Sequence, residues 1–210
     1  MKYEFTGETK VFFGVTLKRI RALVSFGTVA KGELGGWVER ENNLSQVSGN
    51  AWVYDNARVY DNARVSGDAW VSGNAWVYGN ALVSGDARVS GNAQVYDNAW
   101  VSGNARVYGD ALVYDNARVY GKAWVSGNAR VYGDADFFFV GPIGSRNDQL
   151  TVHADAKIGI RWTTGCFSGS EAELSAAIEK THGSTLTGSE FAAQYRAAMV
   201  LALMVVKKKE

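Results

Sequence analysis

Apolar residues recur every six positions along the middle of the chain, from Ala51 to Asp134. Each hexad places Ala and Val two residues apart and closes with Gly or Asp followed by Asn or Asp, except that Lys122 once takes the last position. Residues two apart point to the same side of a strand. Gly, Asn and Asp tolerate the positive φ angles of tight turns. The pattern therefore predicts fourteen very short strands, each followed by a corner, with Ala and Val facing inward.

A single hexad buries too little apolar surface to offset the cost of ordering its backbone, so the hexads must stack as a solenoid. The residue after each Val indicates how many hexads make one coil. If residues eighteen apart stack, one side of the solenoid carries only tyrosines, whereas the other two sides mix Tyr with Ser. The all-tyrosine column comprises Tyr60, Tyr78, Tyr96, Tyr114 and Tyr132. This favours a three-sided prism with three hexads per coil.

The repeat and its Gly/Asp–Asn/Asp corner resemble the hexapeptide repeat of left-handed parallel β-helices, which are known from acyltransferases and related proteins. The whole chain is similar to a family of uncharacterised bacterial and phage-encoded hexapeptide proteins called YdcK-like. Besides the repeat, the matching stretches are residues 31–38, 43–45, 141–147, 165–167 and 180–183. The resemblance implies a mainly β fold with a left-handed coil and a phage or prophage origin. It implies no established activity.

The amino-terminal residues 1–44 are predicted to form a β cap and a first, irregular coil. The cap contains a hairpin around Gly14, and the irregular coil starts at residues 34–38. The regular β-helix is predicted to cover residues 45–136, because the triplet Ser45-Gln46-Val47 keeps the Ala-x-Val register.

Residues 137–210 are predicted to form a small α+β capping domain. Its expected elements are a turn at 141–144, strands at 150–152 and 158–163, a helix from Ser170 to Gly183, and a helix from about Glu190 to Lys207. Ser170 and Glu173 have the spacing of a capping box. Residues 197–206 include no polar side chain, so the second helix is expected to be buried on several sides, either within the domain or against a second chain. We therefore expect a homo-oligomer through residues 190–207.

Composition and charge exclude several classes of protein. The chain has one Cys and a formal net charge of +1, and a single Cys fits a reducing compartment. The chain has neither a charged-then-apolar leader nor an apolar run of about 20 residues. We therefore expect a protein of the bacterial cytoplasm without a membrane span. The near-neutral repeat lacks the basic surface that nucleic-acid binding requires, so a nucleic-acid partner is not expected.

Five tryptophans lie between an Ala and a Val, and strand alternation places them on the outside of the prism. They are Trp52, Trp70, Trp76, Trp100 and Trp124. A large exposed apolar surface usually marks a contact site, so these tryptophans and the tyrosine column are a candidate aromatic binding face. The alternative is that the indoles lie flat and cover the aliphatic stems of neighbouring residues.

Few residues could support catalysis. Cys166 could be a nucleophile with His182 or His153 as its base, but we favour a structural cysteine in a strand-to-helix turn. Two His and one Cys give no metal-ligand spacing, so neither a metal nor a cofactor is expected. The resemblance to hexapeptide acyltransferases implies a catalytic His facing a neighbouring subunit, and residues 45–134 contain no His.

We therefore favour a non-catalytic binding or scaffold protein that presents its aromatic columns to a protein partner, such as a host factor, or to a second copy. The alternative is a small-molecule binder or an acyltransferase-like enzyme with a site between subunits near the C-terminal cap. The residues of that alternative site are Arg146, Arg161, Cys166 and His182.

Overall fold

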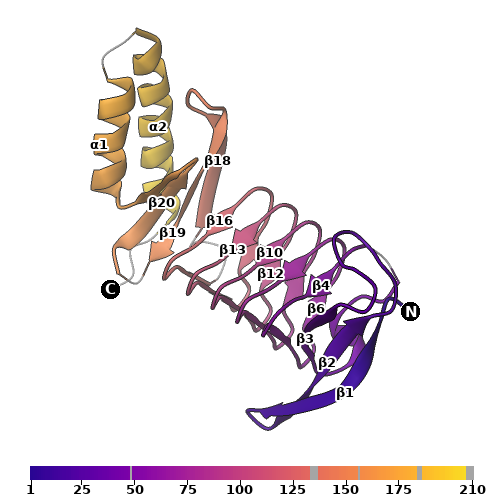
Figure 1. The fold of residues 1–210 in the computed structure, drawn as a ribbon. Coiled ribbons are helices and arrows are strands. Elements are labelled where there is room, and N and C mark those ends of the chain that lie inside the picture. The colour runs from indigo at the N-terminus through magenta and orange to yellow at the C-terminus, as the bar shows by residue number, and fades with distance from the viewer. Residues whose placement is uncertain (48, 133–136, 156, 184–185, 207–210) are drawn as a thin grey trace.

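The computed structural model of the chain describes residues 1–47, 49–132, 137–155, 157–183 and 186–206. The molecule is elongated, with a β-hairpin at one end, a stack of coils in the middle and a small α+β unit at the other end (Figure 1). None of the helices in these ranges is long and apolar enough to cross a membrane.

The hexads form a parallel β-solenoid. Each strand pairs with strands eighteen residues away, as Val53 does with Val71, so the prediction of three hexads per coil is confirmed. The strands belong to three sheets, one for each side of the prism. Left-handed coiling stays a prediction. The repeat strands are β4 (Trp52–Val53), β5 (Arg58–Val59), β6 (Arg64–Val65), β7 (Trp70–Val71), β8 (Trp76–Val77), β9 (Leu82–Val83), β10 (Arg88–Val89), β11 (Gln94–Val95), β12 (Trp100–Val101), β13 (Arg106–Val107), β14 (Leu112–Tyr114), β15 (Arg118–Val119), β16 (Trp124–Val125) and β17 (Arg130–Tyr132).

The core of the prism consists of the stacked Ala and Val columns. Between Ala51 and Val131, the Ala and Val of each hexad are at most 1% exposed. The corners turn through left-handed residues, such as Gly79 with φ 67° and Asp97 with φ 54°. A Cβ on Gly79 would lie 2.9 Å from the backbone nitrogen of Asp97 in the next coil. The corner positions therefore need residues that accept positive φ, and the close stacking of coils favours Gly.

The amino-terminal cap extends one side of the prism. Strands β1 (Tyr3–Phe12) and β2 (Val15–Ala22) form an antiparallel hairpin, and β2 pairs antiparallel with β3 (Leu34–Val38). Strand β3 then pairs in parallel with β5, so it is the irregular first coil that the sequence predicts. A short 3-10 helix, η1 (Glu41–Asn43), follows it.

The regular repeat begins later than the sequence predicts. Val47 is 95% exposed, whereas Leu44 takes the buried position. Gln46 faces the cap, where its Oε1 accepts a hydrogen bond of 2.8 Å from the amide of Lys2. The predicted register of this triplet is wrong because the Gln46 side chain satisfies the backbone of the cap, and the regular hexads start at Ala51.

The C-terminal unit is a four-stranded antiparallel sheet covered by two helices. Its elements are β18 (Phe137–Ile143), β19 (Asp148–Asp155), β20 (Gly159–Thr164), β21 (Phe167–Gly169), α1 (Glu171–His182) and α2 (Leu186–Val205). The predicted capping box of Ser170 and Glu173 is confirmed at the start of α1. The turn expected at 141–144 lies instead at 144–147, because β18 continues to Ile143.

The two faces of this sheet differ in polarity. On one face, Leu150 and Val152 join the apolar core with the two helices. The alternating residues Thr151, His153 and Asp155 lie on the other face, toward the end of the solenoid, and are at most 4% exposed. The junction between solenoid and C-terminal unit is therefore polar and buried.

Within this chain, helix α2 buries one face, so the first alternative of the prediction, burial on several sides within the domain, is wrong, and burial against a second chain stays a prediction. Ala198, Met199 and Ala202 pack in the C-terminal core, where α2 contacts α1 and β18. An uncovered apolar stripe, exposed by 39–74%, comprises Val200, Leu201, Leu203, Met204 and Val205.

Candidate functional site

The predicted tyrosine column is a stacked ladder on one side of the prism. The ring centroids of Tyr60 and Tyr78 lie 5.1 Å apart and those of Tyr78 and Tyr96 lie 4.9 Å apart, with planes within 5°. The ladder continues through Tyr114 to Tyr132. Burial, with a smaller effect of neighbouring Asp and Tyr groups, raises the pKa of Tyr60, Tyr78 and Tyr96 to about 12. The ring faces stack on one another, so the ladder offers ring edges and hydroxyls to the outside.

The five tryptophans do not form a single face. Trp52, Trp70 and Trp124 lie on one side of the prism, Trp76 on the second and Trp100 on the third. The prediction that Trp52 is outward and accessible is wrong, because Trp52 is 0% exposed. Tyr3 and Phe26 of the amino-terminal cap pack edge-on against it.

Arginines cover the other indoles. The guanidinium-to-ring distances are 5.3 Å for Arg58 over Trp76, 4.8 Å for Arg88 over Trp70, 5.1 Å for Arg106 over Trp124 and 5.9 Å for Arg118 over Trp100. Such contacts stabilise neighbouring coils through cation–π attraction. Trp100 is still 42% exposed. The geometry therefore supports the alternative that the indoles pack on neighbouring side chains. It does not support a continuous aromatic platform.

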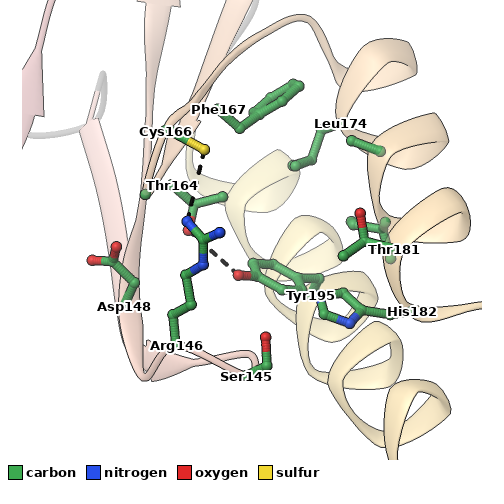
Figure 2. Close-up of a pocket in the computed structure, with 13 residues that line it drawn as sticks. Ser145, Arg146, Asp148, Thr164, Cys166, Phe167, Leu174, Thr181, His182 and Tyr195 are labelled. Carbon is green, nitrogen blue, oxygen red and sulfur yellow. Dashed lines mark hydrogen bonds between the residues drawn. The ribbon is translucent and has the colours of Figure 1, made fainter.

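A pocket in the C-terminal unit brings together three of the four residues that the sequence grouped. Arg146 comes from the β18–β19 turn, Cys166 from the β20–β21 turn and His182 from the end of α1, and all three line a hollow of about 150 Å³. Tyr195 of α2 lies among them (Figure 2). The antiparallel pairing of β19 with β20 brings the two turns to one edge of the sheet, against the helices.

Polar contacts order the pocket (Figure 2). Arg146 Nη1 donates to the Sγ of Cys166 at 3.7 Å. The Tyr195 hydroxyl lies 3.5 Å from Oγ1 of Thr164, and the His182 ring stacks on the Tyr195 ring with planes 18° apart. In the described part of the chain, no carboxylate forms an ion pair with Arg146. Arg146 is therefore a cation without an acidic partner at the edge of the pocket.

The turn that carries Arg146 is anchored to α2. The amide of Gly144 donates to Oε1 of Gln194 at 2.8 Å. Gly144 has φ 69°, and a Cβ there would lie 2.5 Å from the Tyr195 hydroxyl oxygen. Glycine is thus required at this position, because both the backbone angle and the close approach of Tyr195 exclude a side chain.

Arg161 does not belong to this pocket, so its grouping with Cys166 and His182 is wrong. Strand alternation places Arg161 on the opposite face of the sheet, where its Nε donates to Oδ2 of Asp155 at 2.6 Å. Burial opposes ionisation of Asp155, but hydrogen bonds from Arg161 and from two backbone amides outweigh it and lower the Asp155 pKa. Arg161 therefore pairs with Asp155 at the buried junction between the sheet and the solenoid.

His153 lies on that same junction face. It is 0% exposed. Neither ring nitrogen makes a hydrogen bond of acceptable geometry to a described residue, although the backbone of Ser126 lies nearby. Burial, and then the charge of Arg161, lowers the His153 pKa from 6.5 to about 4. His153 and Cys166 are on different sides of the sheet, so His153 is not placed to act as a base for this thiol.

The pocket does not assemble a nucleophile with a base. Cys166 contacts Arg146, whereas His182 packs against Tyr195 and Phe191. Over the residues that the structure describes, no three His, Cys, Asp or Glu side chains converge as a metal site. A guanidinium, a thiol and hydroxyl groups around a small hollow can hold an anion through charge-assisted hydrogen bonds.

A second hollow, of about 320 Å³, lies between the last coils and the polar face of the sheet. The solenoid contributes Arg106, Lys122 and Trp124 to its walls, and the sheet contributes Gln149, Thr151 and Thr163. The two hollows share Asp148, Thr164 and Gly165. The sequence did not lead us to predict this site. The alternation of polar and apolar residues along residues 148–155 could have indicated it, because it places the polar side chains on one face of the strand.

The repeats match a known family model. The model described as the YdcK beta solenoid repeat matches residues 57–73, 75–91, 83–97, 87–103, 93–109, 99–114 and 111–127. The repeat array is thus similar to the YdcK β-solenoid repeat. The resemblance inferred from the sequence is therefore confirmed for the repeats.

The chain is also similar to a protein of Escherichia coli (strain K12) named uncharacterized acetyltransferase YdcK. The two are 37% identical over 62 residues, which cover 26% of this chain and 19% of that protein. The match thus spans about a fifth of the relative's length. The β-solenoid of this chain has no His between Ala51 and Val131, and both candidate hollows involve the C-terminal unit.

Proposed function

We propose that this protein is a non-catalytic small-molecule binding protein, in which a rigid YdcK β-solenoid carries an anion-binding pocket in its C-terminal unit. One observation carries the proposal. Arg146 borders the 150 Å³ hollow without an ion-pair partner in the described chain, and the groups that line the hollow beside it include the Cys166 thiol and the Tyr195 hydroxyl. Asp148 also lines the hollow, where its Oδ1 accepts the amide of Gln149 at 2.8 Å.

A thermal-shift screen of inorganic phosphate, carboxylates, sugar phosphates and nucleotides tests this proposal. A ligand at 100 times its Kd should raise the unfolding free energy by about 2.7 kcal/mol. We expect at least one class of anion to raise the melting temperature of the wild type and to lose this effect in Arg146→Gln. Arg64→Gln, which removes an exposed arginine from the solenoid, is the matched control. The absence of any shift, or an equal shift in Arg146→Gln, would refute the anion site.

Acyl transfer is a second candidate function. It is supported by the printed name of the E. coli relative and by the only cysteine of the chain, which lines the same hollow. The contacts of His182 with Tyr195 oppose it, because no described hydrogen bond joins His182 to Cys166. Release of free coenzyme A from an acyl-CoA, abolished in Cys166→Ser, would favour this candidate over simple binding.

A protein-binding role, which the sequence favours, has its strongest support at α2 rather than at the tryptophans. The uncovered stripe of α2 includes Leu201 at 52% and Met204 at 74% exposure, and contiguous exposed apolar residues mark interaction sites. We propose that this stripe joins two copies of the chain. Native mass measurement should show a dimer that Leu201→Glu dissociates and Val47→Glu, at an exposed position far from α2, does not. A wild type that is monomeric at all concentrations would exclude the dimer.

A further inference from the structure

We propose that the second hollow binds the ring of a sugar phosphate whose phosphate group lies toward Arg146. This inference rests on the proposed function, because it treats the two hollows as one elongated site. Asp148, Thr164 and Gly165 line both hollows, so the two hollows are adjacent. Gly165 has φ 53° and no side chain, and a Cβ there would lie 3.3 Å from Asp148 Oδ2 and 3.7 Å from Arg146 Nη1. A side chain at this position would therefore crowd Asp148 and Arg146.

Trp124 provides a flat apolar surface for the ring. It belongs to β16, which is the edge strand of its sheet. The guanidinium of Arg106, from the preceding coil, lies over the indole at 5.1 Å. Among the described residues no further strand pairs with β16, and the Trp124 side chain lines the hollow. An aromatic ring face carries partial negative charge and packs favourably on the C–H groups of a pyranose.

The opposite wall offers hydrogen-bonding groups suited to hydroxyls. Gln149, Thr151 and Thr163 project from the polar face of the sheet. The Thr151 and Thr163 hydroxyls can both donate and accept hydrogen bonds, and the Gln149 amide has both donor and acceptor atoms, so this wall can pair with sugar hydroxyls.

Charge favours an anionic ligand. Lys122 is the one departure from Asn or Asp at the corner position of the fourteen hexads, and its side chain lines the hollow. A lysine is not needed for the corner, because Asn and Asp serve there in the other hexads. Arg106 and Lys122 line the second hollow and Arg146 lines the first, so three cations face the two hollows against one carboxylate, that of Asp148, which lines both.

Calorimetric titration of the full chain with glucose 6-phosphate, glycerol 3-phosphate, inorganic phosphate and AMP tests the inference. We expect glucose 6-phosphate to bind at least ten-fold more tightly than glycerol 3-phosphate, which has the anion without the ring. Trp124→Leu should remove this ten-fold preference and leave glycerol 3-phosphate binding unchanged. Lys122→Asn, which restores the repeat pattern, should weaken all the phosphates. Trp70→Leu, on the same side of the prism and likewise stacked on an arginine, is the control and should change nothing.

The outcomes separate this inference from the proposed function. Binding of phosphates that depends on Arg146 but is unaffected by Trp124→Leu would overturn the sugar site and leave the anion pocket standing. If AMP binds more tightly than glucose 6-phosphate and loses affinity in Trp124→Leu, the ring site is for a nucleobase, and the sugar assignment is overturned. If neither these phosphates nor the carboxylates of the thermal-shift screen bind the wild type, both proposals fail.

Discussion

The guanidinium of Arg146 lies 3.7 Å from the sulfur of Cys166, although twenty residues separate them in the chain. They meet because β19 pairs antiparallel with β20, which brings the turn before one strand and the turn after the other to the same edge of the sheet. Helix α2 then holds the Arg146 turn through the Gly144–Gln194 hydrogen bond. The candidate site is thus a product of the C-terminal unit, with the solenoid as its support.

Val95→Asp should unfold the solenoid. Val95 is 0% exposed, and its strand β11 lies between β8 and β14. An aspartate there would bury a charge with no partner, which costs several kcal/mol, against a typical total stability of about 5–15 kcal/mol. We expect the cooperative thermal transition followed by circular dichroism to be lost. Gln94→Asp, at the outward neighbour on the same strand, should melt close to the wild type. A Val95→Asp melting temperature equal to wild type would contradict the inward Val column.

Stability should fall as the pH drops from about 6.5 toward 4, because of His153. Burial and the Arg161 charge lower its folded-state pKa from 6.5 to about 4, while Asp155 and the Ser126 backbone act in the opposite direction. The unfolded chain therefore binds a proton at a higher pH than the folded chain, so protonation favours unfolding in this window and has no further effect below it. The gap between the two pKa values corresponds to about 3 kcal/mol of unfolding free energy.

Urea denaturation of wild type and His153→Leu at pH 7 and at pH 4.5 measures this effect. The carboxylates that titrate in this range are the same in both proteins, so the difference isolates His153. We expect the wild type to lose about 2–3 kcal/mol more than the variant between the two pH values. Equal losses would show that His153 is not a buried neutral base.

Arg161→Met should weaken the junction between the solenoid and the C-terminal unit. It leaves Asp155, whose side chain is 0% exposed, without its cation, and breaking a buried pair in this way costs about 3–5 kcal/mol. The double variant Arg161→Met/Asp155→Asn should recover part of the loss in a denaturation experiment. Arg196→Met is the matched control, because the Arg196–Glu179 pair is more than 60% exposed on both sides and exposed pairs contribute about 0–1 kcal/mol. Similar losses for Arg161→Met and Arg196→Met would contradict the buried role of Arg161.

The repeat could be predicted because its signal is local and repeated. Spacing by two assigned Ala and Val to the core, and spacing by eighteen aligned Tyr60 with Tyr78 and Tyr96, which stack as expected. The burial of Trp52 could not be predicted, because it depends on Tyr3 and Phe26, which reach it from an irregular cap. Long-range packing of this kind leaves no periodic trace in the sequence.

The sequence predicted only part of the candidate site, because only part of it follows from the order of the elements. Arg146, Cys166 and His182 each lie at the end of an element near the helices, so their grouping followed from the expected order of strands and helices. Arg161 lies within β20, and its side of the sheet depends on the register with β19. The hollow at Trp124 was missed because it needs the orientation of the sheet against the last coils, which no local pattern specifies.

Alkylation of Cys166 by iodoacetamide, with and without a bound anion, tests the anion pocket most directly. The chain has one Cys, so the labelling rate reports on this pocket alone, and the unfolded protein provides the unprotected rate. With the anion that gives the largest thermal shift, glucose 6-phosphate being the first probe, the rate should fall in proportion to occupancy and approach zero at saturation. An unchanged rate at a ligand concentration that saturates the thermal shift would place the ligand elsewhere and contradict the account.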